Sequence, residues 1–167
     1  APWTPPAAET KDPAIFERAA VLFDRPGLPD DALTDLLRTI EVALELHGNA
    51  PAAVRDRLAA RILTGYPHAN SSVLREQAVL LAFWAPPGAI DALLGSLKPA
   101  RPRDPQIPIA DCLRAVAAGG TIEQKRRILA WFEIAAGWTG GNSFRGYLDA
   151  MLQACIKRTS PAEPRAM

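Results

Sequence analysis

The chain has 167 residues and a formal net charge of +1, from 19 Lys and Arg against 18 Asp and Glu. This length suits one domain, and the near-neutral charge gives no general attraction to nucleic acid or to an anionic membrane. Hydrophobic residues make up 49% of the chain and charged residues 22%, a globular composition that excludes wholesale disorder. The abundance of alanine and leucine favours helices over sheets.

Residues 1–11 are rich in proline and show no periodicity, which predicts an extended arm ahead of a single helical-repeat domain over residues 12–158. Residues 159–167 are polar and contain proline, and we expect a frayed tail there. The chain begins at Ala1 without Met, so we expect either a processed exported protein or an excised fragment. No apolar run approaches the about 18 residues that a membrane span needs.

Between the termini, apolar residues recur with the spacing of amphipathic helices, and Gly and Pro residues separate the segments. The segment at 72–84 becomes apolar on every side, which predicts a helix covered on more than one face. Thr121 and Gln124 have the spacing of a capping box. No segment alternates with a period of two, so we expect no sheet. The predicted helices cover residues 14–23, 31–47, 52–64, 72–84, 89–97, 109–118, 121–136 and 144–158.

The predicted helices pair into hairpins that recur about every 35–40 residues, a period typical of HEAT-class solenoids. Such hairpins must stack, because one hairpin cannot bury its own apolar face. We therefore predict an all-α fold: a HEAT-like helical-hairpin repeat stack (an α-solenoid) of about three hairpins plus a terminal helix. A compact irregular helical bundle is the competing architecture. The predicted pairs are 31–47 with 52–64, 72–84 with 89–97, and 109–118 with 121–136, followed by the terminal helix at 144–158.

A set of short motifs follows in a consistent order along the chain. They are Leu36 to Ala43, Tyr66-Pro67, Leu74 to Glu76, Leu80 to Phe83, Leu113-Arg114, Gly120-Thr121 through Trp131-Phe132, and Gly140 to Phe144. Together they resemble the HEAT-like repeat region of large exported bacterial proteins that also carry a propeller dehydrogenase-like domain and a c-type cytochrome domain. The resemblance implies a periplasmic or otherwise exported scaffold segment. It also implies a protein partner, namely other domains or subunits of a redox assembly.

The cysteines and histidines give no pattern of ligands. Cys112 and Cys155 lie in no CxxC or CxxCH motif, so we expect no structural zinc and no covalent haem. We interpret both as buried thiols, with a disulfide as the alternative in an oxidising compartment. His47 and His68 show no ligand spacing with a carboxylate. We therefore predict no metal and no cofactor.

The loop before the last predicted helix holds the candidate interaction or structural residues: Trp138, Gly140, Gly141, Asn142 and Ser143. A glycine pair before a helix can leave N–H groups free for an anion, but no P-loop pattern follows it. We interpret the loop as a tight turn in which the glycines allow positive φ and Asn142 or Ser143 caps the last helix. Trp138 either packs the loop down or serves as an exposed interface anchor.

The charged clusters are interpreted as structural. We expect Arg75 and Glu76 to link adjacent repeats. We expect solvated helix faces from two basic groups: Arg55, Arg57 and Arg61, and Lys125, Arg126 and Arg127. With no catalytic constellation in the sequence, the first hypothesis is a non-catalytic scaffold or protein-interaction module. The alternative is a small helical-repeat enzyme or a nucleic-acid-binding repair-type domain. A scaffold predicts a smooth groove without buried titratable groups, whereas an enzyme predicts a cleft lined by Asp or Glu with perturbed pKa values.

Overall fold

The computed structural model describes residues 12–98 and 102–159, and these ranges are all-α, as predicted, with no strand. The predicted arm at 1–11 and the tail beyond Thr159 lie outside the described residues. No helix in the described part of the chain is long and apolar enough to cross a membrane. The elements are α1 (Ala14–Phe23), α2 (Asp30–His47), α3 (Ala52–Thr64), α4 (Ser71–Trp84), α5 (Ala89–Ser96), α6 (Gln106–Val116), the 3₁₀ turn η1 (Ala117–Gly119), α7 (Ile122–Ala136) and α8 (Phe144–Thr159).

The helix starts follow local chemistry. Thr121 caps α7 as predicted, because its hydroxyl accepts from the Gln124 N–H at 3.2 Å while Gln124 Oε1 accepts from the Thr121 N–H at 2.9 Å. Helix α6 begins at Gln106, earlier than the predicted start at residue 109. Pro108 then lies in the first helical turn, where its missing N–H needs no partner. Pro108 therefore belongs to the helix rather than to the link before it.

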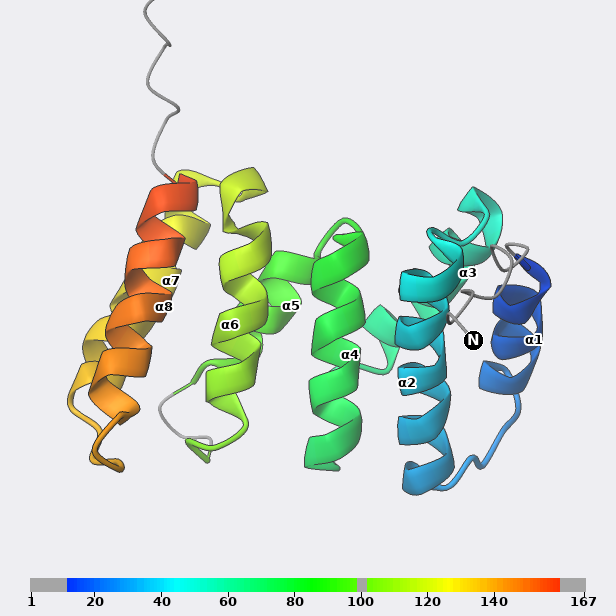
Figure 1. The fold of residues 1–167 in the computed structure, drawn as a ribbon, viewed down its shortest axis with the longest axis horizontal. Coiled ribbons are helices and arrows are strands. Elements are labelled where there is room, and N and C mark those ends of the chain that lie inside the picture. The colour runs from blue at the N-terminus through cyan, green and yellow to red at the C-terminus, as the bar shows by residue number, and fades with distance from the viewer. Residues whose placement is uncertain (1–11, 99–101, 160–167) are drawn as a thin grey trace, which may run out of the picture.

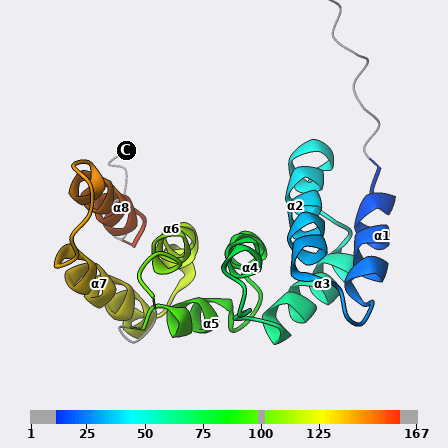
Figure 2. The same cartoon turned by 90° about the horizontal axis from the view of Figure 1, so that it is seen from below.

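The helices form two rows. Helices α2, α4, α6 and α8 lie side by side along the long axis of the molecule (Figure 1), and each packs on the next. Helices α3, α5 and α7 form the second row on the other side of them (Figure 2). Both ends of the molecule bend toward the same side, so that α2, α4, α6 and α8 line the concave face (Figure 2). We call α2, α4, α6 and α8 the inner row, and α3, α5 and α7 the outer row.

Of the three predicted pairs of neighbouring helices, only α4 and α5 are in substantial contact. In the structure α3 packs on α4, α5 on α6 and α7 on α8, whereas α2 and α3 share few contacts. The reason lies in the links. Gly48, directly after α2, and Gly88, directly before α5, are both at positive φ in short links that turn the chain sharply into the outer row. Figure 2 shows the result, with α5 running lengthwise beneath α4 and α6, which are seen end-on.

Helix α4 is at the centre of the packing. It contacts α2, α3, α5 and α6, as expected for a helix apolar on every side. Leu80 and Leu81 are fully buried there. One residue departs from this expectation, because the Phe83 side chain is 58% exposed. Helix α4 is therefore buried on most of its circumference but keeps one apolar side chain in solvent.

Candidate functional site

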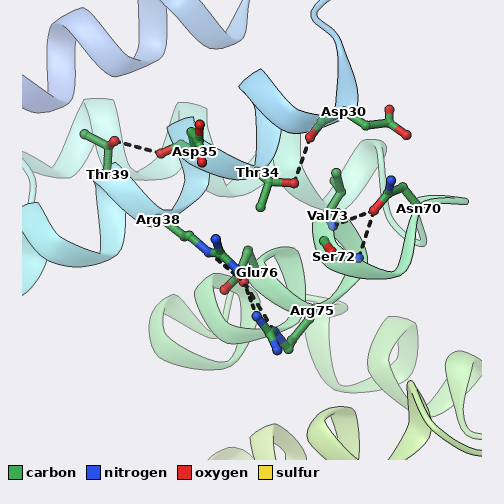
Figure 3. A network of polar contacts seen from close by, with 10 residues as sticks. All are labelled: Asp30, Thr34, Asp35, Arg38, Thr39, Asn70, Ser72, Val73, Arg75 and Glu76. Carbon is green, nitrogen blue, oxygen red and sulfur yellow. Dashed lines mark hydrogen bonds and ion pairs between the residues drawn. The ribbon is translucent and has the colours of Figure 1, made fainter.

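The contact between α2 and α4 contains a buried carboxylate held by two arginines. The Glu76 side chain is 6% exposed. Its Oε1 accepts from Arg38 Nε of α2 at 3.1 Å and from Arg75 Nη2 of its own helix at 2.9 Å (Figure 3). Glu76 thus joins two helices of the inner row through Arg38, the linking role expected from the sequence, whereas Arg75 pairs with Glu76 within α4. A buried carboxylate needs such charged partners to offset its lost hydration.

The local sequence fixes where these side chains meet. Asn70 caps α4, since its Oδ1 accepts from the Ser72 N–H at 2.9 Å and from the Val73 N–H at 3.3 Å (Figure 3). This cap sets the start of α4 and hence the register of Arg75 and Glu76. On α2, Arg38 and Glu41 are three residues apart and lie on neighbouring positions of one helix face.

Glu41, the second carboxyl of this region, differs from Glu76 because it has no ion pair and its pKa is raised. Its pKa is raised from the ordinary 4.5 to about 7, chiefly by burial and then by the charge and hydrogen bonding of Glu76, against the opposing charges of Arg38 and Arg75. Its Oε1 is buried and has no hydrogen-bond partner among the described residues. Glu41 therefore titrates near neutral pH and has one oxygen unsatisfied.

A mainly apolar cleft of about 270 Å³ opens beside Glu41, between α2 and α4. We call it the α2–α4 cleft. Neither Glu41 nor Glu45 forms an ion pair with any described residue, although the charges of Arg38 and Arg75 act on Glu41 from a longer distance. The exposed ring of Phe83 forms part of its wall. The cleft is lined by Glu41, Leu44, Glu45, Val79, Leu80 and Phe83.

The sequence analysis missed this site. It singled out Glu76 but not Glu41 or Phe83. The available signal was the position of Glu41 inside the apolar run from Ile40 to Leu44, where a carboxylate is costly unless it is paired. The structure also meets the condition set for an enzyme, because a Glu with a perturbed pKa lines a cleft.

The two cysteines are not joined in a disulfide. Cys112 on α6 is half-buried, and burial, followed by the charges of Asp111, Glu41 and Glu76, raises its pKa to about 12. Cys155 on α8 is buried, and burial raises its pKa as well. Both groups therefore stay protonated thiols at neutral pH and are poor nucleophiles.

The predicted loop site is a packed corner between α7 and α8. Trp138 is half-buried, with its ring edge-on to Trp131 at a centroid distance of 5.6 Å. Arg103 covers the Trp138 ring, with its guanidinium carbon 5.5 Å from the centroid. Of the two roles considered for Trp138, packing against the loop is the one these contacts describe.

At this corner a glycine is needed because it lacks a side chain, not because it can adopt positive φ. Neither Gly140 nor Gly141 has positive φ, contrary to the expectation. A Cβ on Gly140 would lie 2.5 Å from Cγ of Phe144, whereas a Cβ on Gly141 would meet nothing within 4 Å. The small residue that this corner needs is therefore Gly140, because Phe144 packs directly on its backbone.

The predicted cap on α8 is not formed. Asn142 and Ser143 are exposed, and no hydrogen bond from either side chain occurs within the described residues. Main-chain bonds start the helix instead: the Phe144 N–H donates to the Gly141 carbonyl at 2.9 Å, and the Tyr147 N–H donates to the Ser143 carbonyl at 3.0 Å. The structure does not test whether Trp138, Gly140, Gly141, Asn142 and Ser143 contact a partner, so that role stays a prediction.

Several of the remaining basic residues and the histidines make polar contacts with other segments. Arg57 pairs with Glu17 of α1, Arg61 with Asp24 at the end of α1, and Arg127 with Asp91 of α5. His47 Nδ1 accepts from the Asp12 N–H at 3.3 Å. Across 12–98 and 102–159, no group of three or more His, Cys, Asp and Glu side chains is arranged to hold a metal. The basic pairs are Arg57–Glu17 at 3.3 Å, Arg61–Asp24 at 3.3 Å and Arg127–Asp91 at 3.2 Å.

No protein-family model, no curated protein and no solved structure matches the chain. The resemblance to the HEAT-like region of exported redox proteins therefore stays a prediction. The arguments about function depend on the geometry of the inner row.

Proposed function

We propose that this chain is a non-catalytic, HEAT-like helical-repeat scaffold that binds a segment of a partner protein on its concave face. The support for a repeat architecture is the regular alternation of inner-row and outer-row helices along the chain (Figure 2). Stacked repeats of this kind create extended concave surfaces, which such proteins use for binding.

The observation that carries the proposal is the α2–α4 cleft on the inner row. Phe83 is 58% exposed at its wall, although every other face of α4 is packed against neighbouring helices. Exposed aromatic side chains beside a concavity are typical anchors of protein interfaces. A protein segment that covers Phe83 would remove this apolar surface from water.

The identity of the partner and its compartment are supported by the resemblance alone. On that basis the partner is another domain or subunit of an exported, periplasmic redox assembly, and the scaffold positions it. The near-neutral charge of the chain is consistent with a protein partner rather than nucleic acid.

A second candidate function rests on Glu41. A carboxyl with a pKa near 7 at the wall of a cleft can serve as a general acid or base. Against this, the rest of the cleft consists of Leu44, Glu45, Val79, Leu80 and Phe83, which offer neither a nucleophile of the Ser or Cys type nor a donor for a developing negative charge. The lining suits binding better than turnover, and we place the scaffold first.

Selection of peptides from a random displayed library against the full chain tests the proposal. We expect selected peptides to lose at least tenfold in affinity for Phe83→Ser. The matched control is Ile122→Ser on the outer row, since Ile122 is 73% exposed and should not affect binding. A selection that yields no peptide whose affinity depends on Phe83 contradicts the proposal. Turnover of chromogenic esters, amides or glycosides that is lost in Glu41→Gln would favour the enzyme instead.

A further inference from the structure

The α2–α4 cleft has an uneven charge balance, which bears on what it binds. Glu76 is compensated by Arg38 and Arg75, whose nitrogens lie within 3.1 Å of its Oε1. Glu41 and Glu45 line the same cleft and have no ion-pair partner among the described residues. The cleft therefore presents net negative charge to whatever enters it.

One oxygen of Glu41 has no hydrogen-bond partner among the described residues, which also bears on the kind of occupant. Oε1 of Glu41 is buried without a hydrogen-bond donor, and a buried acceptor without a donor costs free energy. Because Glu41 lines the cleft, an occupant with N–H groups would offer its carboxylate a donor. An anionic occupant would instead be repelled by both carboxylates, and a purely apolar one would leave Oε1 unsatisfied.

The other walls of the cleft are apolar. Leu44 and Leu80 are buried at its base, and Val79 and the exposed Phe83 complete it. A lysine or arginine side chain combines the two required properties, because its aliphatic stem packs on apolar surface while its head carries the charge. An aromatic ring such as Phe83 also attracts a nearby cation.

Building on the scaffold function proposed above, we propose that the α2–α4 cleft seats a lysine or arginine of the bound partner segment. The cation lies against the carboxylates of Glu41 and Glu45, and an adjacent apolar residue of the segment covers Phe83. The occupant is thus a basic and apolar stretch of a partner protein.

Binding of this kind is coupled to the proton of Glu41. The groups that act on Glu41 are Arg38 on α2, Arg75 and Glu76 on α4, and Cys112 on α6; the described residues of α1 contribute none. Since the pKa of Glu41 is about 7, part of the protein is protonated there at neutral pH. A bound cation favours the carboxylate, so the proton passes to solvent on binding. Affinity should therefore rise with pH by about tenfold between pH 6 and pH 8.

The first test uses three small probes of equal chain length: hexylammonium, hexanoate and 1-hexanol. Each is titrated into the ¹⁵N-labelled full chain at pH 8, and amide shifts are followed. We expect saturable shifts in α2 and α4 with hexylammonium alone. Glu41→Gln and Glu45→Gln should each weaken this binding at least fivefold, while Glu133→Gln on the exposed side of α7 should leave it unchanged. Equal shifts with hexanoate, or no effect of either variant, would overturn the proposal.

The second test separates this inference from the scaffold function. Each basic residue of a selected peptide is replaced by glutamine, and the peptide is titrated against wild type and Phe83→Ser. Loss of at least tenfold in affinity on replacing one basic residue, together with a pH dependence that disappears in Glu41→Gln, supports the inference. Peptides that need Phe83 but no basic residue overturn it and leave the scaffold function standing. Peptides indifferent to Phe83 overturn the scaffold function, whatever hexylammonium does.

Discussion

The α7–α8 corner and the α2–α4 cleft differ in how completely their side chains are packed and hydrogen-bonded within the chain. At the corner, Phe144 packs on the Gly140 backbone, and Trp138 packs between Trp131 and Arg103. At the cleft, Glu41 has a buried oxygen without a donor, and Phe83 is largely exposed. At the corner the conspicuous side chains pack on one another, whereas at the cleft a buried oxygen has no partner among the described residues and an aromatic ring is exposed.

This difference shows which kind of residue points to function. Glycine pairs and tryptophans attract notice in a sequence, but their demands here are met by neighbouring side chains. A carboxyl within an apolar run attracts less notice, yet its hydration is lost and only partly replaced. If the proposed function holds, the unsatisfied group is the better indicator of a binding site than the conspicuous motif.

The largest expected effect separates the base of the cleft from its rim. Leu80 is fully buried, so Leu80→Ala should lower the free energy of unfolding by about 2–5 kcal/mol. Phe83→Ala, at the exposed rim, should change it by less than about 1 kcal/mol. Urea titrations followed by circular dichroism measure both. A loss below about 0.5 kcal/mol for Leu80→Ala would show that α4 is not central to the core.

The next effect distinguishes the two glycines of the corner. Gly140→Ala places a methyl group against Phe144 and should cost about 1–3 kcal/mol of stability. Gly141→Ala has open space around the new Cβ and should stay within about 0.5 kcal/mol of wild type. Thermal unfolding of the pair gives the comparison. Equal midpoints would mean that Phe144 does not pack on Gly140.

The pH dependence of stability sharpens the account of the cleft. The pKa of Glu41 is raised in the folded chain to about 7 from 4.5, so between these values the folded state binds more protons than the unfolded state. The free energy of unfolding contributed by this group therefore falls as pH rises from 4.5 to 7, by about 1–2 kcal/mol once solvent screening is allowed for. Glu41→Gln should remove this component. Identical pH profiles for wild type and Glu41→Gln would contradict the raised pKa.

The smallest effect concerns the start of α8. Neither Asn142 nor Ser143 makes a side-chain hydrogen bond among the described residues, so Asn142→Ala and Ser143→Ala should each change stability by less than about 0.5 kcal/mol. A capping residue would cost about 1 kcal/mol when replaced by alanine. A loss of that size in either variant would show that the corner contains a side-chain cap.

Local patterns in the sequence were enough to predict the helices but not which helices pack on one another. Apolar spacing placed every helix within a few residues, and the spacing of Thr121 and Gln124 predicted the capping box that α7 has. Most of the predicted pairing of helices failed, because pairing depends on how links such as the one beginning at Gly48 redirect the chain. Glu41 and Phe83 were missed for a related reason: their burial and exposure are set by helices distant in the sequence.

The central claim is that the α2–α4 cleft holds a basic side chain of a protein segment. A double-mutant cycle between Glu45 and the basic residue of a selected peptide tests it most directly, with dissociation constants measured by calorimetry at pH 8. Glu45 is exposed, so Glu45→Gln should not disturb the fold. The account predicts a coupling free energy above about 0.5 kcal/mol, as for residues in contact. Additivity within about 0.3 kcal/mol would contradict it, because the basic residue would then lie elsewhere on the protein.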